Sequence, residues 1–344
     1  MKEESEIKLY GGIDLHSNNK VVALLDENNE VVYQRRLAND LSYIVSQLAV
    51  YKEGIQGLAV ESTYNWYWLV DGLMEAGYQV HLVNTAAVKQ YEGLKYTDDH
   101  SDSRWLAHLF RLGILPEGYI YPKAGRAVRD LLRKRGQLVR LKTTNLLSIQ
   151  NLVSRNTGGS MSANRVKKLT SEEVGELFPD QDIALAIQSN LVVMKTLSEQ
   201  IKIIERAVTN KAKLEPEYKH LLSTPGIGVI LGLTIMLETG DIHRFAKAGN
   251  YASYCRCVGS TRTSNGKQKG KGNTKNGNKY LSWAFIEAAN FAIRYNDKIK
   301  GYYQRKQAKT NKVVAIKTIA HKLSRASYYM MRDQKSFELD KAFG

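Results

Sequence analysis

The sequence predicts an α/β domain at the N-terminus, a long helical connector, and a mainly α-helical domain at the C-terminus. Three observations lead to this prediction. Strand-like segments alternate with helical segments in residues 1–125, helical periodicity dominates residues 126–215, and residues 216–344 end in a series of helices. With 344 residues, of which 43% are hydrophobic, the chain is long and apolar enough to form separate hydrophobic cores.

Within residues 1–125, the hydrophobic pattern predicts five strands and two early helices. Strands expected at 8–14, 21–26 and 31–36 follow one another through short turns and form an antiparallel meander. The order is completed by a helix over 41–51, a strand over 57–61, a helix over 65–76 and a strand over 78–83. A meander followed by alternating helices and strands is the order of elements in RNase H-like folds.

The connector is predicted to contain two long helices separated by a flexible loop over 157–164. The first helix, within 123–150, is strongly basic, and it offers six candidate contacts to nucleic acid: Arg126, Arg129, Arg133, Lys134, Arg135 and Arg140. The second helix, over 183–213, carries apolar residues three and four positions apart between Leu191 and Val208. That spacing predicts a coiled-coil seam, which pairs either with another helix or with another subunit.

The formal net charge of +16 makes a polyanion the expected partner. Nucleic acid is favoured over a membrane, because no apolar run is long enough to span a bilayer and residues 1–6 lack the apolar core of a signal peptide. We therefore expect a cytoplasmic protein without a membrane partner. The sequence contains no phosphate-binding loop of the type that ATPases use.

Four carboxylates stand where the elements of such a domain converge. Asp14 lies in the first predicted strand, Glu61 ends the fourth, and Asp99 and Asp102 are three apart at the start of a helix, on one helix face. Carboxylate oxygens from several elements are the ligands that Mg²⁺ prefers, and two such ions can activate a nucleophile and stabilise a leaving oxygen at phosphorus. Each acid alone would also suit a helix or turn cap. Together they predict a metal site, with Asp98 as an alternative to Asp99.

Between Asp241 and Glu287 the chain has no acidic residue, and a glycine-rich basic segment spans 262–279. We expect this segment to be a flexible loop that follows a phosphate backbone. Its candidate contacts are Arg262, Lys267, Lys269, Lys271, Lys275 and Lys279. Ser260 and Ser264 also lie in this basic region, where cations would stabilise the charge that develops when a serine attacks a phosphodiester. A solvated loop whose serines only form hydrogen bonds is the alternative.

Five motifs resemble the insertion-sequence family 110 transposases, in particular their 1111 subgroup. They are GIDLHS at 12–17, VESTYNWYWLVDGL at 60–73, KYTDDHSDSRWLAHLFRLG at 95–113, STPGIG at 223–228 and SNGKQKGKGNTKNGNKYL at 264–281. The resemblance extends over nearly the whole chain. It implies a RuvC-like, that is RNase H-like, domain in residues 1–125, a basic helical and coiled-coil connector in 126–215, and a transposase domain with a catalytic serine in 216–344.

Position by position, the resemblance implies four metal-binding, catalytic acids that use Mg²⁺ as cofactor: Asp14, Glu61, Asp99 and Asp102. Their register follows from Leu106-Ala107, which begin four residues after the last acid, although Ser103 stands where the family more often has alanine. The family's serine directly precedes a glycine, whereas Asn265 separates Ser264 from Gly266 in this chain. Ser264 is the better match for the nucleophile, and Ser260 is the reserve.

The predicted function is that of a transposase, a DNA recombinase that cuts and rejoins strands through a phosphoserine intermediate with the help of Mg²⁺-binding carboxylates. The resemblance further implies a structured non-coding guide RNA that bridges donor and target DNA, a homo-oligomer between dimer and tetramer, and a place at the nucleoid in the bacterial cytoplasm. Two alternatives stay open. One is a RuvC-like, structure-specific endonuclease of the Holliday-junction resolvase type that uses water, and the other is a non-catalytic nucleic-acid-binding protein.

Overall fold

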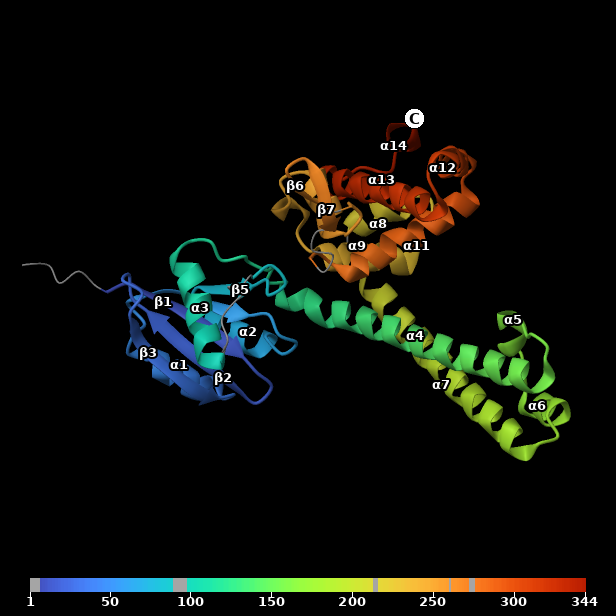
Figure 1. The fold of residues 1–344 in the computed structure, drawn as a ribbon, viewed down its shortest axis with the longest axis horizontal. Coiled ribbons are helices and arrows are strands. Elements are labelled where there is room, and N and C mark those ends of the chain that lie inside the picture. The colour runs from blue at the N-terminus through green and yellow to red at the C-terminus, as the bar shows by residue number, and fades with distance from the viewer. Residues whose placement is uncertain (1–6, 89–97, 213–215, 260, 272–275) are drawn as a thin grey trace, which may run out of the picture. The chain divides into compact units, whose positions relative to one another are not determined.

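The structure is a computed structural model that describes residues 7–88, 98–212, 216–259, 261–271 and 276–344. For residues 212, 216, 217, 262 and 271 it describes the backbone alone. The chain divides into two compact units, Met1–Ile120 and Tyr121–Gly344, and each unit has a hydrophobic core of its own (Figure 1).

The first unit is built on a five-stranded sheet, and all five predicted strands are confirmed. They are β1 (Leu9–Leu15), β2 (Asn19–Leu25), β3 (Val31–Ala38), β4 (Ile55–Glu61) and β5 (Val80–Val83). The spatial order is β3-β2-β1-β4-β5, with β1, β2 and β3 antiparallel and with β4 and β5 parallel to β1. The two strands that carry Asp14 and Glu61 are therefore direct neighbours in the middle of the sheet.

Helices cover both faces of this sheet. One face carries the core with α1 (Leu41–Ala49) and α2 (Tyr67–Glu75), to which β1 contributes Leu9, Ile13 and Leu15. Because side chains alternate along a strand, Gly12 and Asp14 point to the opposite face. On that face lies α3 (Asp99–Arg111), which packs against β1 so closely that a Cβ on Gly12 would be 2.0 Å from the Ser103 carbonyl oxygen. This contact sets the position of the acids on α3 relative to Asp14.

Replacing Gly12 with alanine is expected to displace α3 and to weaken the candidate metal site. The new methyl group would also lie 2.5 Å from the Ala107 backbone nitrogen, so the helix backbone itself would have to move. We expect a loss of about 2–3 kcal/mol in the free energy of unfolding, measured by denaturant titration. Gly125→Ala is the matched control, because nothing lies within 4 Å of a Cβ there. Equal stability of the Gly12 and Gly125 variants would contradict the proposed role of this contact.

The second unit begins with two long helices, α4 (Lys123–Thr157) and α7 (Gln181–Ala212), which pack against each other (Figure 1). The loop after α4 leads into two short helices, α5 (Ala163–Val166) and α6 (Ser171–Leu177). Met194, Ile201 and Val208 of the predicted seam are buried, and Met194 packs in one cluster with Ile149 and Val153 of α4. The predicted seam therefore pairs with another helix of the same chain.

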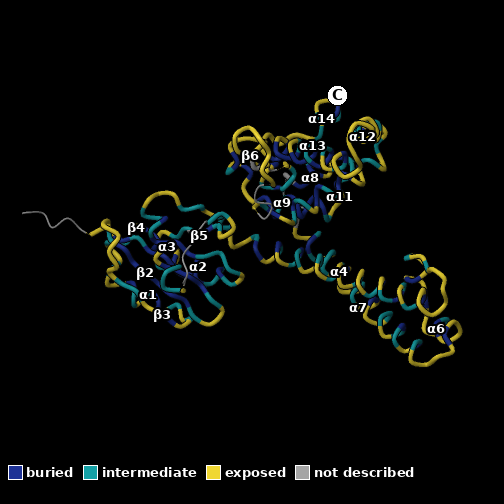
Figure 2. The backbone as a smooth tube through the Cα atoms, in the orientation of Figure 1, coloured by how far each residue is buried: buried dark blue, intermediate teal, exposed yellow. Residues whose placement is uncertain are grey.

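The rest of this unit is mainly helical, as predicted. Its helices are α8 (Pro216–Leu222), α9 (Val229–Thr239), a 3-10 turn (Ile242–Arg244), α10 (Ala248–Tyr254), α11 (Lys279–Tyr295), α12 (Asp297–Lys309), α13 (Lys312–Asp333) and α14 (Leu339–Phe343). The helices α9, α11 and α13 share a buried core, and Figure 2 shows buried stretches of backbone along them. Tyr251, Phe285 and Tyr328 are large, fully buried members of this core. In the described parts of the chain, no helix combines the length and apolar character needed to cross a membrane.

The basic segment 262–279, predicted to be a flexible loop, instead contains a β-hairpin. Strands β6 (Thr261–Ser264) and β7 (Lys267–Lys271) are antiparallel, with Ser264 opposite Lys267. The two residues between them, Asn265 and Gly266, have φ angles of 49° and 70°. Positive φ at both positions is what a type I′ turn requires, and Asn-Gly is the dipeptide that favours it most. The turn chemistry therefore orders a segment whose composition favoured a loop.

Candidate functional site

The centre of the candidate site is Asp14, which is 4% exposed although it carries a carboxylate. It is the second-to-last residue of β1 and lies opposite Val21 of β2. The parallel pairing of Ile13 with Val60 places Glu61, the last residue of β4, next to Asp14 on the face covered by α3. The ends of two central strands thus bring two of the predicted acids together.

A cavity of about 260 Å³ joins three of the four predicted acids. Asp14, Glu61 and Asp102 line it, together with Thr85, Val88, Trp105 and Leu106. Burial raises the pKa of Glu61 to about 8, helped by a hydrogen bond with Asp14 and by the negative charges of Asp14 and Asp102. Carboxylates held close together in a half-buried cavity repel one another, so the binding of either a proton or a cation is favoured. Three carboxylates around one cavity have the chemistry of a divalent metal site, while the ligand atoms that lie within 4.8 Å of one another among the described residues belong to Asp14, His16 and Asp99.

Asp98 and Asp99, the two candidates for the third acid, have different roles in the structure. Asp98 is the N-cap of α3, where its carboxylate accepts a hydrogen bond of 2.8 Å from the Ser101 backbone N–H while the Ser101 hydroxyl bonds the Asp98 N–H. Its carboxylate is thus used to start the helix. Asp99 points towards β1 and β3 instead, which favours Asp99 as a member of the site.

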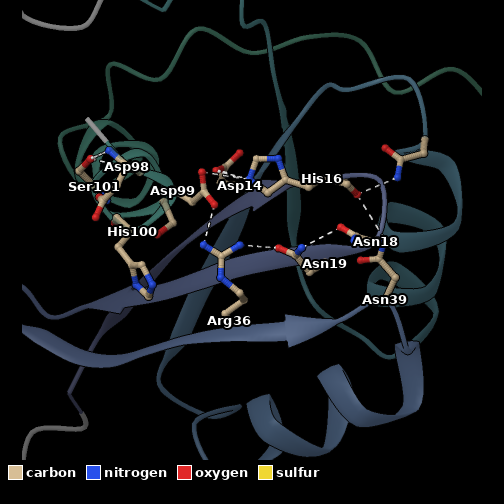
Figure 3. A network of polar contacts seen from close by, with 12 residues as sticks. Asp14, His16, Asn18, Asn19, Arg36, Asn39, Asp98, Asp99, His100 and Ser101 are labelled. Carbon is tan, nitrogen blue, oxygen red and sulfur yellow. Dashed lines mark hydrogen bonds and ion pairs between the residues drawn. The ribbon is translucent and has the colours of Figure 1, made fainter. Parts of the chain in front are cut away.

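Asp99 lies beside Asp14, and its own contacts, which Figure 3 shows, are with Arg36 and His16. One carboxylate oxygen of Asp99 accepts a hydrogen bond of 2.6 Å from Arg36 of β3, and this bond holds the pKa of Asp99 below its usual value. The other oxygen lies 3.3 Å from Nε2 of His16. The same imidazole nitrogen lies 3.1 Å from Oδ2 of Asp14. Asp14 therefore faces two groups, the cavity acids on one side and His16 with Asp99 on the other.

The predictions from sequence did not include His16 and Arg36. A signal for His16 was present, because residues two apart in an extended chain point to the same side, so His16 continues the alternation of Gly12 and Asp14. Arg36 had no comparable signal. Only the antiparallel pairing of β3 with β2, at Arg36 and Val21, brings its guanidinium to Asp99.

Glu61→Gln is expected to remove a pH-dependent loss of stability. The folded-state pKa of about 8 lies above the usual 4.5, so in metal-free protein this group favours folding fully below pH 4.5, and that contribution is lost between about pH 4.5 and 8. After allowance for solvent screening, we expect the variant to be more stable than the wild type by about 1–2 kcal/mol at pH 8 and equal at pH 4.5. Thermal unfolding in EDTA at both pH values measures this. An unchanged pH dependence in the variant would contradict the assignment.

The predicted nucleophile Ser264 is the last residue of β6 and is exposed beside the hairpin turn. Lys267 and Lys269 on β7 and Lys279 at the start of α11 are exposed as well. The side chains of Arg262 and Lys271 are not described, and Ser260 and Lys275 lie outside the described residues. The hairpin therefore presents a serine hydroxyl next to its turn, directly opposite Lys267 on the paired strand.

Of the six cations predicted on α4, Lys134 and Arg140 are exposed. Two others are buried: Arg126 donates to the Tyr121 carbonyl oxygen at 2.6 Å, and Arg129 stacks on the Tyr121 ring with 3.5 Å between its Cζ and the centroid. Both guanidinium groups therefore contact Tyr121 inside the fold and are not exposed for contact with a nucleic acid.

Arg133 and Arg135 form ion pairs that hold helices together. Arg133 donates two hydrogen bonds, of 2.6 and 2.7 Å, to the carboxylate of Glu238 on α9. Glu238 itself is only 2% exposed. Asn278 donates to the same carboxylate, and Arg135 pairs with Glu205 of α7 at 2.7 Å. These contacts are those of a structural network, so we keep Lys134 and Arg140 as the candidate nucleic-acid contacts of α4.

Comparison with known proteins connects this geometry to a family. Residues 11–155 match the family described as "Transposase" under the name DEDD_Tnp_IS110, and residues 218–304 match the "Transposase IS116/IS110/IS902 family". Together the two matches cover about two thirds of the chain and include Asp14, Glu61, Asp99, Asp102 and Ser264. The chain belongs to the IS110/IS116/IS902 family of transposases. As a transposase it is an enzyme that acts on DNA in transposition.

Individual relatives of this transposase agree with the family match. The transposase for insertion sequence element IS1111A from Coxiella burnetii is 24% identical over 297 residues, which are 84% of this chain and 79% of the relative. A probable family 20 transposase from Pseudomonas aeruginosa is 23% identical over 236 residues, 66% of this chain and 68% of the relative. An insertion element IS110 protein from Streptomyces coelicolor is 24% identical over 147 residues, 42% of this chain and 36% of the relative.

Proposed function

We propose that this transposase cuts and rejoins DNA through a covalent bond to Ser264, with divalent metal ions held by Asp14, Glu61, Asp99 and Asp102. The observation that carries the proposal is the convergence of Asp14, Glu61 and Asp102 from β1, β4 and α3 on one cavity, with Asp99 beside it. The strand order β3-β2-β1-β4-β5 supports assigning the first unit to the RNase H-like folds. Mg²⁺ is the proposed ion, because all four of these residues offer carboxylate oxygens.

In the proposed reaction, the Oγ of Ser264 attacks a phosphodiester. A new P–Oγ bond forms, the bond from phosphorus to one deoxyribose oxygen breaks, the serine loses its proton and the leaving oxygen gains one. Rejoining reverses these changes on a different strand end. Because one phosphodiester replaces another, the exchange needs no nucleotide hydrolysis, which agrees with the missing ATPase motif in the sequence. Metal ions, when bound, stabilise the charge on the phosphate oxygens.

The proposed nucleic-acid contacts are exposed cations on three elements of the second unit: Lys134 and Arg140 on α4, Lys267 and Lys269 on β7, and Lys279 at the start of α11. The net charge of +16 supports a polyanionic partner. We propose that the partners are donor and target DNA, a structured non-coding guide RNA, and further copies of the chain, from a dimer to a tetramer, in the bacterial cytoplasm. Sequencing the RNA that co-purifies with the protein tests the guide.

A suicide DNA substrate tests the function. This substrate carries a nick near the cut site, so that the released fragment diffuses away and a covalent intermediate accumulates. We expect a Mg²⁺-dependent protein–DNA adduct, and phosphopeptide mass spectrometry should find the modified residue in 261–271. Cleavage without an adduct would favour a nuclease that uses water. No cleavage under any condition that supports DNA binding would favour a non-catalytic binding protein.

A further inference from the structure

His16 has an unusual place beside the acids. Its Nε2 atom is buried and close to two carboxylate oxygens, at 3.1 Å from Asp14 and 3.3 Å from Asp99, yet neither contact has the geometry of a hydrogen bond. Three ligand atoms, one from each residue, lie within 4.8 Å of one another. Donor atoms that bind one octahedral ion at about 2.1 Å are themselves about 3 Å apart. The spacing is therefore that of ligands around a common ion.

The surrounding contacts fix these groups in position. The His16 backbone N–H donates to the Asn19 carbonyl oxygen at 2.9 Å, and the His16 carbonyl oxygen accepts from the side-chain amide of Asn65 at 3.0 Å. Arg36 occupies one oxygen of Asp99 and is itself bound at 2.7 Å by the side-chain oxygen of Asn19. The second oxygen of Asp99 is thereby turned towards His16. Such support is typical of outer-shell residues around a metal ion.

We propose that the site holds two metal ions of different character, and that His16 is a direct ligand of one of them. Asp14 would be shared. The oxygen-only subsite consists of Asp14, Glu61 and Asp102, and the mixed subsite consists of Asp14, His16 and Asp99. An imidazole nitrogen is a better ligand for transition metal ions than for Mg²⁺, so the mixed subsite selects a transition metal ion over Mg²⁺, and Mn²⁺ is the ion with which we probe it. This inference rests on the proposed metal site and adds to it the identity of one ligand and the preferred ion.

A simpler role for His16 exists, in which a protonated imidazole only balances the charge of two carboxylates. In that role a bound metal ion would push the imidazole away, and no nitrogen would coordinate it. The two roles differ in a spectroscopic signature that does not depend on catalysis. An imidazole nitrogen bound to Mn²⁺ produces ¹⁴N couplings in pulsed EPR spectra, whereas an imidazole outside the coordination sphere does not.

The experiment uses the full-length protein loaded with Mn²⁺ and compares the wild type with His16→Gln. We expect ¹⁴N coupling in the wild type and none in the variant, and a Mn²⁺ dissociation constant for the mixed subsite that rises by at least about 10-fold. The Mg²⁺ affinity of the oxygen-only subsite should change little. His100→Gln is the matched control, because His100 is next to Asp99 in the chain while Figure 3 shows its ring apart from Asp14 and His16. This control should keep the wild-type spectrum.

Two outcomes separate the failure of this inference from the failure of the metal site itself. Mn²⁺ binding that is lost in Asp14→Asn, but without ¹⁴N coupling in the wild type, would overturn the role of His16 and leave the carboxylate site intact. Binding that Asp14→Asn does not weaken would overturn both. Persistence of the coupling in His16→Gln would assign it to another imidazole and would also overturn the inference.

Discussion

Replacing Asp14 with asparagine is expected to lower the rate of DNA strand cleavage by at least about 1,000-fold, which corresponds to about 4 kcal/mol of transition-state stabilisation. Asp14 is the acid that faces both Glu61 in the cavity and Asp99 beside it, so the loss of its charge affects every proposed metal ion. Asparagine has nearly the same shape, and the fold should persist. Removing a buried negative charge among other acids should even raise the stability of the metal-free protein. Cleavage assays and calorimetric Mg²⁺ titration measure the two effects.

Asp98→Asn is the matched control for this prediction. It makes the same chemical change on a neighbouring element, and asparagine is as good an N-cap as aspartate. Because the Asp98 carboxylate is used to cap α3, we expect cleavage within a few-fold of the wild type. Equal effects of the two substitutions would contradict the distinct roles given to Asp14 and Asp98. Full cleavage by Asp14→Asn would rule out Asp14 as a metal ligand in the reaction.

The sheet and the position of the acids could be predicted because both follow from local patterns. Alternation along β1 separates Ile13, which enters the core, from Asp14, which faces α3. A carboxylate at the end of a strand and two acids in the first turn of a helix are also readable without a structure. The choice between Asp98 and Asp99 as the third acid could not be made from the sequence, because it depends on which of the two residues caps α3. A shift of the helix start by one residue would give the capping role to Asp99 instead of Asp98.

The nucleic-acid contacts were harder to predict, because the use of an arginine depends on partners far away in the sequence. Arg133 binds Glu238, 105 residues later, and that pairing turns an apparent DNA contact into a partly buried structural bond. A run of cations indicates a polyanion only where the cations have no internal partner. The hairpin around Ser264 shows the opposite case, since its Asn265-Gly266 turn was visible in the sequence but was outweighed by a composition typical of loops.

Ser264→Ala is expected to abolish the covalent protein–DNA adduct completely while leaving the fold and the metal site unchanged. The serine is exposed at the end of β6, so the loss of its hydroxyl should change the free energy of unfolding by less than about 0.5 kcal/mol. Alanine offers no oxygen that could form the P–O bond. The suicide substrate measures the adduct, and Mg²⁺ titration of the same sample confirms that the carboxylates still bind.

Thr263→Ala provides the matched control, because it removes a hydroxyl from the adjacent position, whose side chain points to the other face of the strand. Adduct formation should persist in this variant. Ser260→Ala decides between the two candidate serines: loss of the adduct there, together with persistence in Ser264→Ala, would transfer the role of nucleophile to Ser260. An adduct that survives both serine substitutions would exclude both residues. Since hairpin geometry places Ser264 directly before a tight turn, at the exposed end of its strand, we expect the DNA to reach Ser264.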